Sequence, residues 1–169
     1  PRSGNPYAYK DSYEAWEPRF DYSLLPVRLK KGSNQFIFHC SRGRFKARLI
    51  AARSEAFINT KDLTVPDFVA GQSVDAPAGV VIVNASARPL DGWTLDVAPA
   101  RAAKRSTSIP PIPPFSLRKV PFTIRDRTPR TGGNVPLSLT LRDGAGRVKD
   151  TAGILLRVVG PRDARKETF

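Results

Sequence analysis

The sequence predicts an all-β protein: an antiparallel immunoglobulin-like β-sandwich preceded by a short partial sandwich or hairpin unit. Three observations predict this class. Sixteen prolines and twelve glycines divide the 169 residues into short segments. Many of these segments are rich in β-branched or aromatic residues and alternate apolar with polar positions, as half-buried strands do. Patterns with the period of a helix are almost absent.

Composition excludes several classes of protein. A hydrophobic fraction of 40% is enough for a real core. No apolar run approaches the roughly 18 to 20 residues that a membrane span needs, and no signal segment opens the chain. Because the chain starts at Pro1 without Met, we expect a mature or excised piece. The single cysteine, Cys40, has no partner for a disulfide, and no Cys or His cluster suggests a metal or other cofactor.

The opening of the chain, residues 1–18, is aromatic and polar without a clear period. A strip of this kind usually needs another surface to order it, so we expect it to contact a partner, most simply a neighbouring domain of the same polypeptide. The residues in question are Tyr7, Tyr9, Tyr13 and Trp16.

A hairpin follows. Apolar and polar residues alternate over 25–29 and 35–39, on either side of a turn at 31–34. Phe36 and Phe38 are predicted on one face, and a third strand is predicted over 45–49. Together with the opening segment these strands make up the first predicted unit, residues 1–56.

The second predicted unit, residues 57–169, is the sandwich. We expect residues 57–60 to close the first unit and 62–65 to open the second, with the boundary within 53–61. The proline-dense stretch 99–114 is interpreted as an extended linker that crosses from one sheet to the other. An open barrel is the competing shape, and the disulfide of antibody domains is missing. The clearest predicted strands lie at 79–85, 93–97, 117–124, 135–141 and 153–159, with a turn at 143–146 before the last.

The net charge of +13 permits a polyanionic partner such as nucleic acid or an acidic polysaccharide. The nearest pattern to a base-stacking platform places Phe36, Phe38 and Phe45 beside basic residues. Their alternation is also that of a hairpin core beneath a solvated basic face, which is the interpretation that we favour. The basic residues are Arg42, Arg44, Lys46 and Arg48.

No pattern of catalytic residues is present. His39 is the only histidine, and in a strand its side chain would point away from that of Cys40. Asp62 with Asp67, and Asp91 with Asp96, are spaced closely enough to consider as acid and base, but turns explain them better. Trp93 has core-like spacing, so we interpret it as interior rather than sugar-binding. We therefore predict no catalytic residues and no enzyme activity in this chain.

Residues 25–38 and 42–49 resemble the β-sandwich region that precedes the catalytic domain in large bacterial α/β-hydrolases of the prolyl-oligopeptidase type. Segments 64–68, 83–86, 119–122 and 166–169 are similar to the second sandwich of the same arrangement. The resemblance spans roughly residues 22–169. It implies a secreted or periplasmic hydrolase whose catalytic residues lie beyond Phe169, with this chain as interdomain scaffold or substrate-presenting surface. Polyanion binding is the alternative function.

Overall fold

The computed structural model describes residues 24–39 and 47–160, and the strands that it contains all lie between residues 56 and 159. The described residues include no helix, and so none that could cross a membrane. The strands are β1 (Ala56–Thr64), β2 (Phe68–Val69), β3 (Ser73–Asn84), β4 (Thr94–Pro99), β5 (Arg105–Ser108), β6 (Ser116–Arg127), β7 (Gly133–Arg142) and β8 (Val148–Val159).

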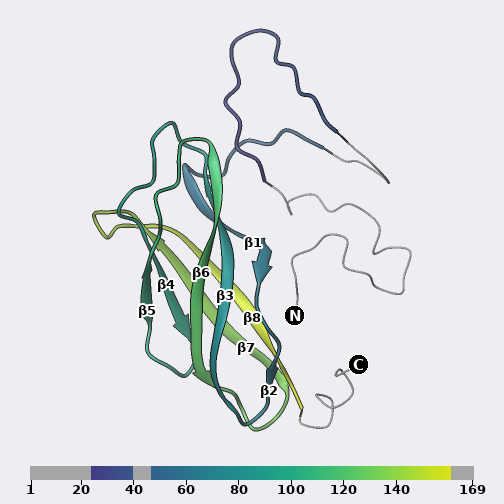
Figure 1. The fold of residues 1–169 in the computed structure, drawn as a ribbon, viewed down its shortest axis with the longest axis vertical. Helices are drawn as coiled ribbons and strands as arrows, with labels where there is room; N and C mark the ends of the chain where they lie inside the picture. Colours follow the sequence, from purple (N-terminus) through teal and green to yellow (C-terminus); the bar gives the residue numbers. More distant parts are fainter. Residues whose placement is uncertain (1–23, 40–46, 161–169) are drawn as a thin grey trace.

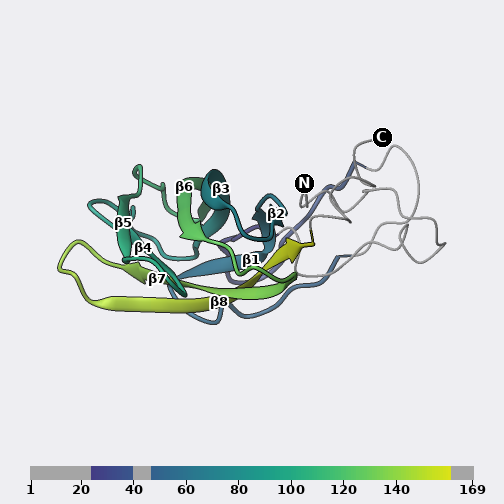
Figure 2. The same cartoon turned by 90° about the horizontal axis from the view of Figure 1, so that it is seen from below.

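The strands form two sheets that pack face to face. One sheet has the order β1-β3-β6 and the other the order β2-β8-β7-β4-β5. All pairs are antiparallel except β2 with β8, because the chain leaves the first sheet after β1 and joins the edge of the second as β2. Figure 1 shows the strands running along the long axis, and Figure 2 shows the two layers nearly edge-on. The molecule is an immunoglobulin-like β-sandwich, as the sequence predicted.

The core lies between the sheets, and strand alternation accounts for it. In β7, Leu137, Leu139 and Leu141 are fully buried, whereas Ser138 between them is exposed. Inward residues of the two sheets, together with Leu90, Ile109 and Ile112 from connecting loops, form one continuous cluster. The predicted strands at 117–124, 135–141 and 153–159 lie within observed strands, and β8 pairs with β7 as expected. The strands predicted at 79–85 and 93–97 match β3 and β4 except for one residue each, Ala85 and Trp93.

The middle strand β3 is buried on both faces over residues 80–83, as its continuous apolar run predicted. Val80 and Ile82 face the core. Val81 and Val83 face outward, yet they are almost fully buried in a second, smaller cluster with Phe57, against which Leu24 packs. We call this group the outer cluster. It shows that part of the outer face of the three-stranded sheet is covered by the chain that precedes β1.

Prolines within strands occur only where one neighbouring strand is absent. Proline cannot donate a ladder hydrogen bond, so it is tolerated at a free edge. β6 is an edge strand, and β1 ends its pairing with β3 at Gly79. β4 ends its pairing with β7 at Leu137, and β5 ends its pairing with β4 at Val97. The prolines at these free positions are Pro77, Pro99, Pro121 and Pro136.

The prediction of a hairpin over residues 25–39 is wrong, because the turn forms but the two strands beside it do not. Residues 24–39 and 47–52 contain no strand, although the turn itself is held by Asn34, whose side chain accepts from Lys30 N at 2.9 Å and donates to Lys30 O at 2.9 Å. Phe36 and Phe38 do share a face, with their rings stacked at 6.4 Å, but both are exposed rather than in a core. Residues 45 and 46 of the third predicted strand lie outside the described residues.

Two further predictions need correction. Residues 57–60 do not close a separate unit, because they continue with 62–64 in one strand, β1, through a bulge between Asn59 and Leu63. The stretch 99–114 does cross between sheets, but it is not merely a linker, because it contains β5 and the buried side chains of Ile109 and Ile112. Whether residues 1–56 form a unit of their own stays a prediction.

Candidate functional site

Most of the predicted surface residues lie outside the described part of the chain, and so does Cys40. Arg48 is described and exposed, in the segment that leads into β1. The predicted surface residues outside the described part are Tyr7, Tyr9, Tyr13, Trp16, Arg42, Arg44 and Lys46.

The carboxylates considered for acid–base chemistry have other partners. Asp62 binds Lys119 at 2.8 Å across the sheet, and Asp67 binds Arg157 at 3.4 Å. Asp91 accepts from the backbone N of Gly92 at 2.9 Å, in the turn that precedes β4. Within the described ranges no three His, Cys, Asp or Glu side chains gather as a metal site would require. These carboxylates serve turns and ion pairs.

Asp96 is the most buried carboxylate of the described residues and lies on the outer face of the five-stranded sheet. Arg142 donates to it at 2.7 Å and Lys104 at 3.2 Å. Burial by itself raises the pKa of Asp96, but hydrogen bonds from Arg142, Ser106 and Lys104 outweigh burial and hold the pKa below its ordinary value. The two cations therefore keep Asp96 ionised, and its role is structural.

Asp143 organises the predicted turn between β7 and β8. Its carboxylate accepts from the backbone N of Ala145 at 3.0 Å and of Arg147 at 2.9 Å, and from the Arg147 side chain at 2.8 Å. Gly146 closes the turn with a φ of 79°, a conformation that favours glycine. Burial raises the pKa of Asp143, and these hydrogen bonds lower it by more, so the net direction is downward.

Asn84 ties two loops to the end of β3. It is fully buried, and its side-chain amide donates to the carbonyl oxygens of Arg88 (2.7 Å), Ile112 (3.2 Å) and Pro113 (2.9 Å). Its carbonyl oxygen accepts from both the backbone and the hydroxyl of Ser86. This one side chain fixes the β3–β4 turn against the proline-rich crossover, so its burial is explained without a ligand.

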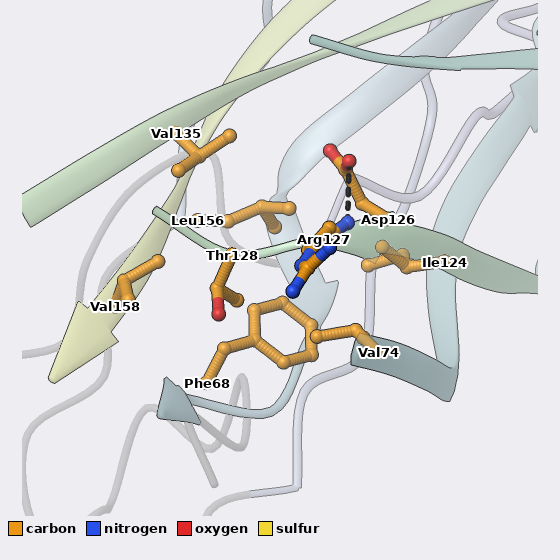
Figure 3. A pocket seen from close by; sticks show the side chains of 9 residues that line it. All are labelled: Phe68, Val74, Ile124, Asp126, Arg127, Thr128, Val135, Leu156 and Val158. Atoms are coloured by element: carbon orange, nitrogen blue, oxygen red, sulfur yellow. Dashed lines mark hydrogen bonds between the residues drawn. The ribbon is translucent and has the colours of Figure 1, made fainter. Parts of the chain in front are cut away.

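A small cavity lies between the sheets at the end of the sandwich where β6 finishes (Figure 3). Its volume is only about 10 Å³, too small for a substrate. Val74 and Ile124 line it from one sheet, and Leu156 and Val158 from the other. Asp126 lies at its rim, with Oδ1 accepting from Arg127 N at 2.7 Å and Oδ2 buried without a hydrogen-bond partner among the described residues.

A larger hollow lies on the outer face of the three-stranded sheet, where β1 ends. Its volume is about 390 Å³, and it opens to solvent. Thr64, Gly79 and Pro121 stand side by side on the three strands and form its floor. Gly79 has no side chain, and the aliphatic part of Lys119 lies beside it, with Cγ 3.6 Å from the position that a Cβ would take. The residues that line this outer hollow are Thr64, Pro77, Ala78, Gly79, Lys119 and Pro121.

The third candidate is residues 24–52, which we call the N-terminal arm. Figure 1 shows its described parts beyond the end of the sandwich where β1 begins. Eight of the eleven exposed large hydrophobic side chains of the described residues belong to it. The three most exposed are Leu25 (74%), Ile37 (88%) and Leu49 (63%). The others are Val27, Leu29, Phe36, Phe38 and Ile50.

The sequence analysis missed the charge of the N-terminal arm and the outer hollow, although the sequence contains a signal for each. The arm contains seven basic residues and no acidic residue, a bias hidden by the charge of the whole chain. Gly79 stands beside a run of four buried residues, and an isolated glycine in a strand often marks a place where another group approaches closely.

Comparisons with known proteins add little beyond the fold. No protein-family model matches the chain, and no curated protein matches it. The solved CARDB domain of PF1109 from Pyrococcus furiosus is similar over 62% of this chain and 92% of its own length, with 16% identity and a TM-score of 0.42. The ASH/PapD-like domain 7 of human CEP192 is similar over 72% and 96%, with 12% identity and a TM-score of 0.35.

Proposed function

We propose that the chain is a non-catalytic accessory β-sandwich that acts as an interdomain scaffold by docking its N-terminal arm on a neighbouring domain of the same polypeptide. The observation that carries the proposal is the concentration of exposed apolar side chains in the arm, while the sandwich surface has only three. Exposed apolar side chains that gather in one segment support an interaction site there.

The energetics favour docking of the arm. Leu25, Ile37 and Leu49 are mostly exposed in the isolated chain. Burying one such side chain completely contributes about 1.5–3 kcal/mol. Several of them together offset the entropy that is lost when an extended segment becomes ordered on a partner.

The charge of the arm indicates what its partner looks like. Seven basic residues without an acidic one favour a partner surface that combines acidic residues with an apolar groove. A second copy of this chain fits poorly, because the whole chain carries a net charge of +13 and two copies would repel each other.

The polyanion alternative has less support. Lys104 and Arg105 flank the turn after β4, at the opposite end of that strand from the side where the arm joins β1. Lys104 is also engaged by Asp96 at 3.2 Å. Most exposed apolar residues of the arm are aliphatic, whereas single-stranded nucleic acid is bound by stacking on aromatic rings. A hydrolase as the parent protein is still only what the resemblance of the sequence implies.

Photo-cross-linking tests the proposal in cells, in the protein at its natural length. A photoreactive amino acid replaces Ile37 in the arm or, as a matched control, Leu155, which is exposed on the outer face of the five-stranded sheet. We expect the Ile37 probe to form a strong cross-link to another region of the same polypeptide, and the Leu155 probe to form little. Equal cross-linking at both positions, or an Ile37 adduct only with nucleic acid or a different protein, would contradict the proposal.

A further inference from the structure

We propose that residues 25–39 of the arm close into a two-stranded β-hairpin when the arm docks, and that this hairpin adds to the free edge of a β-sheet in the neighbouring domain. Such a docked hairpin depends on the proposed scaffold function, and it specifies the surface that the arm recognises. In the isolated chain the hairpin is not formed, because residues 24–39 contain no strand.

The turn of the hairpin is already in place. The side-chain amide of Asn34 accepts from Lys30 N and donates to Lys30 O, both at 2.9 Å, and it donates to Gly32 O at 3.0 Å. Gly32 has a φ of 90°, a conformation that favours glycine. Figure 1 shows this part of the arm as an open loop whose two legs diverge. The loop is thus closed before a partner binds, which reduces the entropy cost of pairing the legs.

One register places the apolar side chains of both legs on one face. A turn at 31–34 pairs Leu29 with Phe36. Two residues further along each leg, it pairs Val27 with Phe38. Residues that are directly opposite in an antiparallel pair lie on the same face, so these four side chains form one apolar surface. The rings of Phe36 and Phe38 already stack, with their centroids 6.4 Å apart.

The hairpin needs a third strand. Two strands alone are marginally stable in water, and a further strand or a packing surface is required to hold them. Among the described residues no strand of the sandwich pairs with the arm, and the large apolar side chains of residues 25–39 are exposed. The missing strand is therefore supplied by the partner, and this explains why an alternating sequence forms no strand in the isolated chain.

The composition of the two legs indicates which leg pairs with the partner. Residues 35–39 contain no proline, and the run Phe-Ile-Phe at 36–38 consists of residue types that favour strands and is apolar toward both faces. The other leg, residues 25–29, contains Pro26, which cannot donate a ladder hydrogen bond and suits an edge strand or the start of a strand. Arg28 on that leg opposes pairing with yet another strand. The partner strand accordingly lies beside residues 35–39.

Cysteine pairs across the two legs test the hairpin in the protein at its natural length. In a Cys40→Ser background, Pro26→Cys is combined with His39→Cys, because these two positions are directly opposite in the proposed register. Their Cα atoms would be about 4.5–5.5 Å apart, which is within the range of a disulfide. The matched control combines Val27→Cys with His39→Cys. It differs by one position and places the two thiols on opposite faces.

The readout is the rate of disulfide formation in oxidised glutathione, followed by mass spectrometry of the linked peptides. We expect the opposite pair to oxidise at least several-fold faster than the control pair in the natural-length protein. In the chain of residues 1–169 we expect both pairs to oxidise at the same slow rate. Equal rates for the two pairs in the natural-length protein, or a preference for the opposite pair in the 1–169 chain as well, would overturn the inference.

Photo-cross-linking at Ile37 separates failure of the hairpin from failure of the scaffold function. An Ile37 adduct within the same polypeptide, together with equal oxidation of the two pairs, means that the arm docks without forming the hairpin. The scaffold function then stands and the hairpin is refuted. Absence of the Ile37 adduct contradicts the scaffold function itself, and the docked hairpin is refuted with it.

Discussion

At the scale of single residues, the buried carboxylate of Asp96 is the charged group on which the stability of the fold depends most clearly. Arg142 and Lys104 reach it from elsewhere in the sequence, and their hydrogen bonds lower its pKa in the folded state in spite of its burial. A group with a lowered folded pKa binds its proton more weakly in the folded than in the unfolded state. It therefore stabilises the fold when ionised, and this contribution disappears in acid.

We predict that the part of the stability supplied by Asp96 is present in full above about pH 5 and is lost progressively below about pH 4, near the unfolded pKa of an aspartate. Asp96→Asn should lower the free energy of unfolding by about 1–3 kcal/mol at neutral pH, because a charged hydrogen bond to a buried group is lost. It should also flatten the pH dependence. Urea denaturation at several pH values measures both effects.

The control for this prediction is Asp75→Asn. Asp75 pairs with Arg125 at 2.8 Å, but both side chains are about half exposed, and such pairs contribute little. An Asp96→Asn variant with the same pH profile as the wild type would contradict the prediction.

At the scale of elements, β1 depends on one side chain of β8. Asp150 accepts from the backbone N of Ile58 at 2.7 Å and from Arg53 at 2.6 Å, and Arg53 also donates to the carbonyl of Ile58 at 3.0 Å. Both backbone groups of Ile58 are thus satisfied at the outer edge of β1. We predict that Asp150→Ala frays β1 and speeds hydrogen exchange at Ile58, with a cost of about 1–3 kcal/mol.

Hydrogen exchange followed by NMR checks this prediction residue by residue. The matched control is Asp75→Ala, which removes a carboxylate from an exposed ion pair and should leave exchange in β1 unchanged. Uniform acceleration over all strands would instead indicate a global loss of stability, without a specific role at the edge of β1.

The individual strands show which parts of the fold could be predicted from the sequence. The strands β7 and β8 were predictable because apolar residues on alternate positions have no other good explanation. β5 was missed because its residues, Arg-Ser-Thr-Ser, form a polar edge strand without apolar alternation. Residues 25–29 alternate just as well as β7 does, yet they form no strand. Alternation predicts a chain that can pair and bury one face, but it does not say whether the partner lies within the same chain.

Candidate sites were harder to predict than strands for a related reason. The outer hollow exists only because Thr64, Gly79 and Pro121 become neighbours through strand register, although the first and the last are 57 positions apart in the sequence. The pairing of Asp96 with Arg142 spans 46 residues. Such contacts depend on topology, which local patterns do not determine. Turns around Asp91 and Asp143, by contrast, are local and were predicted correctly.

At the scale of the whole molecule, the sandwich is built without the residues that precede it. The described core residues between the sheets all lie between Ala56 and Val158. Immediately before β1, Arg53, Ser54 and Glu55 hydrogen-bond to Ile58, Ala56 and Ala85, and all three belong to the chain that starts at residue 53. The main loss on removing the arm is the contact of Leu24 with the outer cluster. The sandwich should therefore fold by itself.

We predict that a chain of residues 53–169 unfolds in a single cooperative transition. Losing the half-buried Leu24 should cost about 1–2 kcal/mol, which lowers Tm by several degrees at the roughly 4–8 °C per kcal/mol typical of small domains. Calorimetry of this chain and of the full chain provides the comparison. Loss of the cooperative transition would show that the arm is part of the folding unit, and the scaffold would then need a rigid connection to its partner in place of an arm that docks.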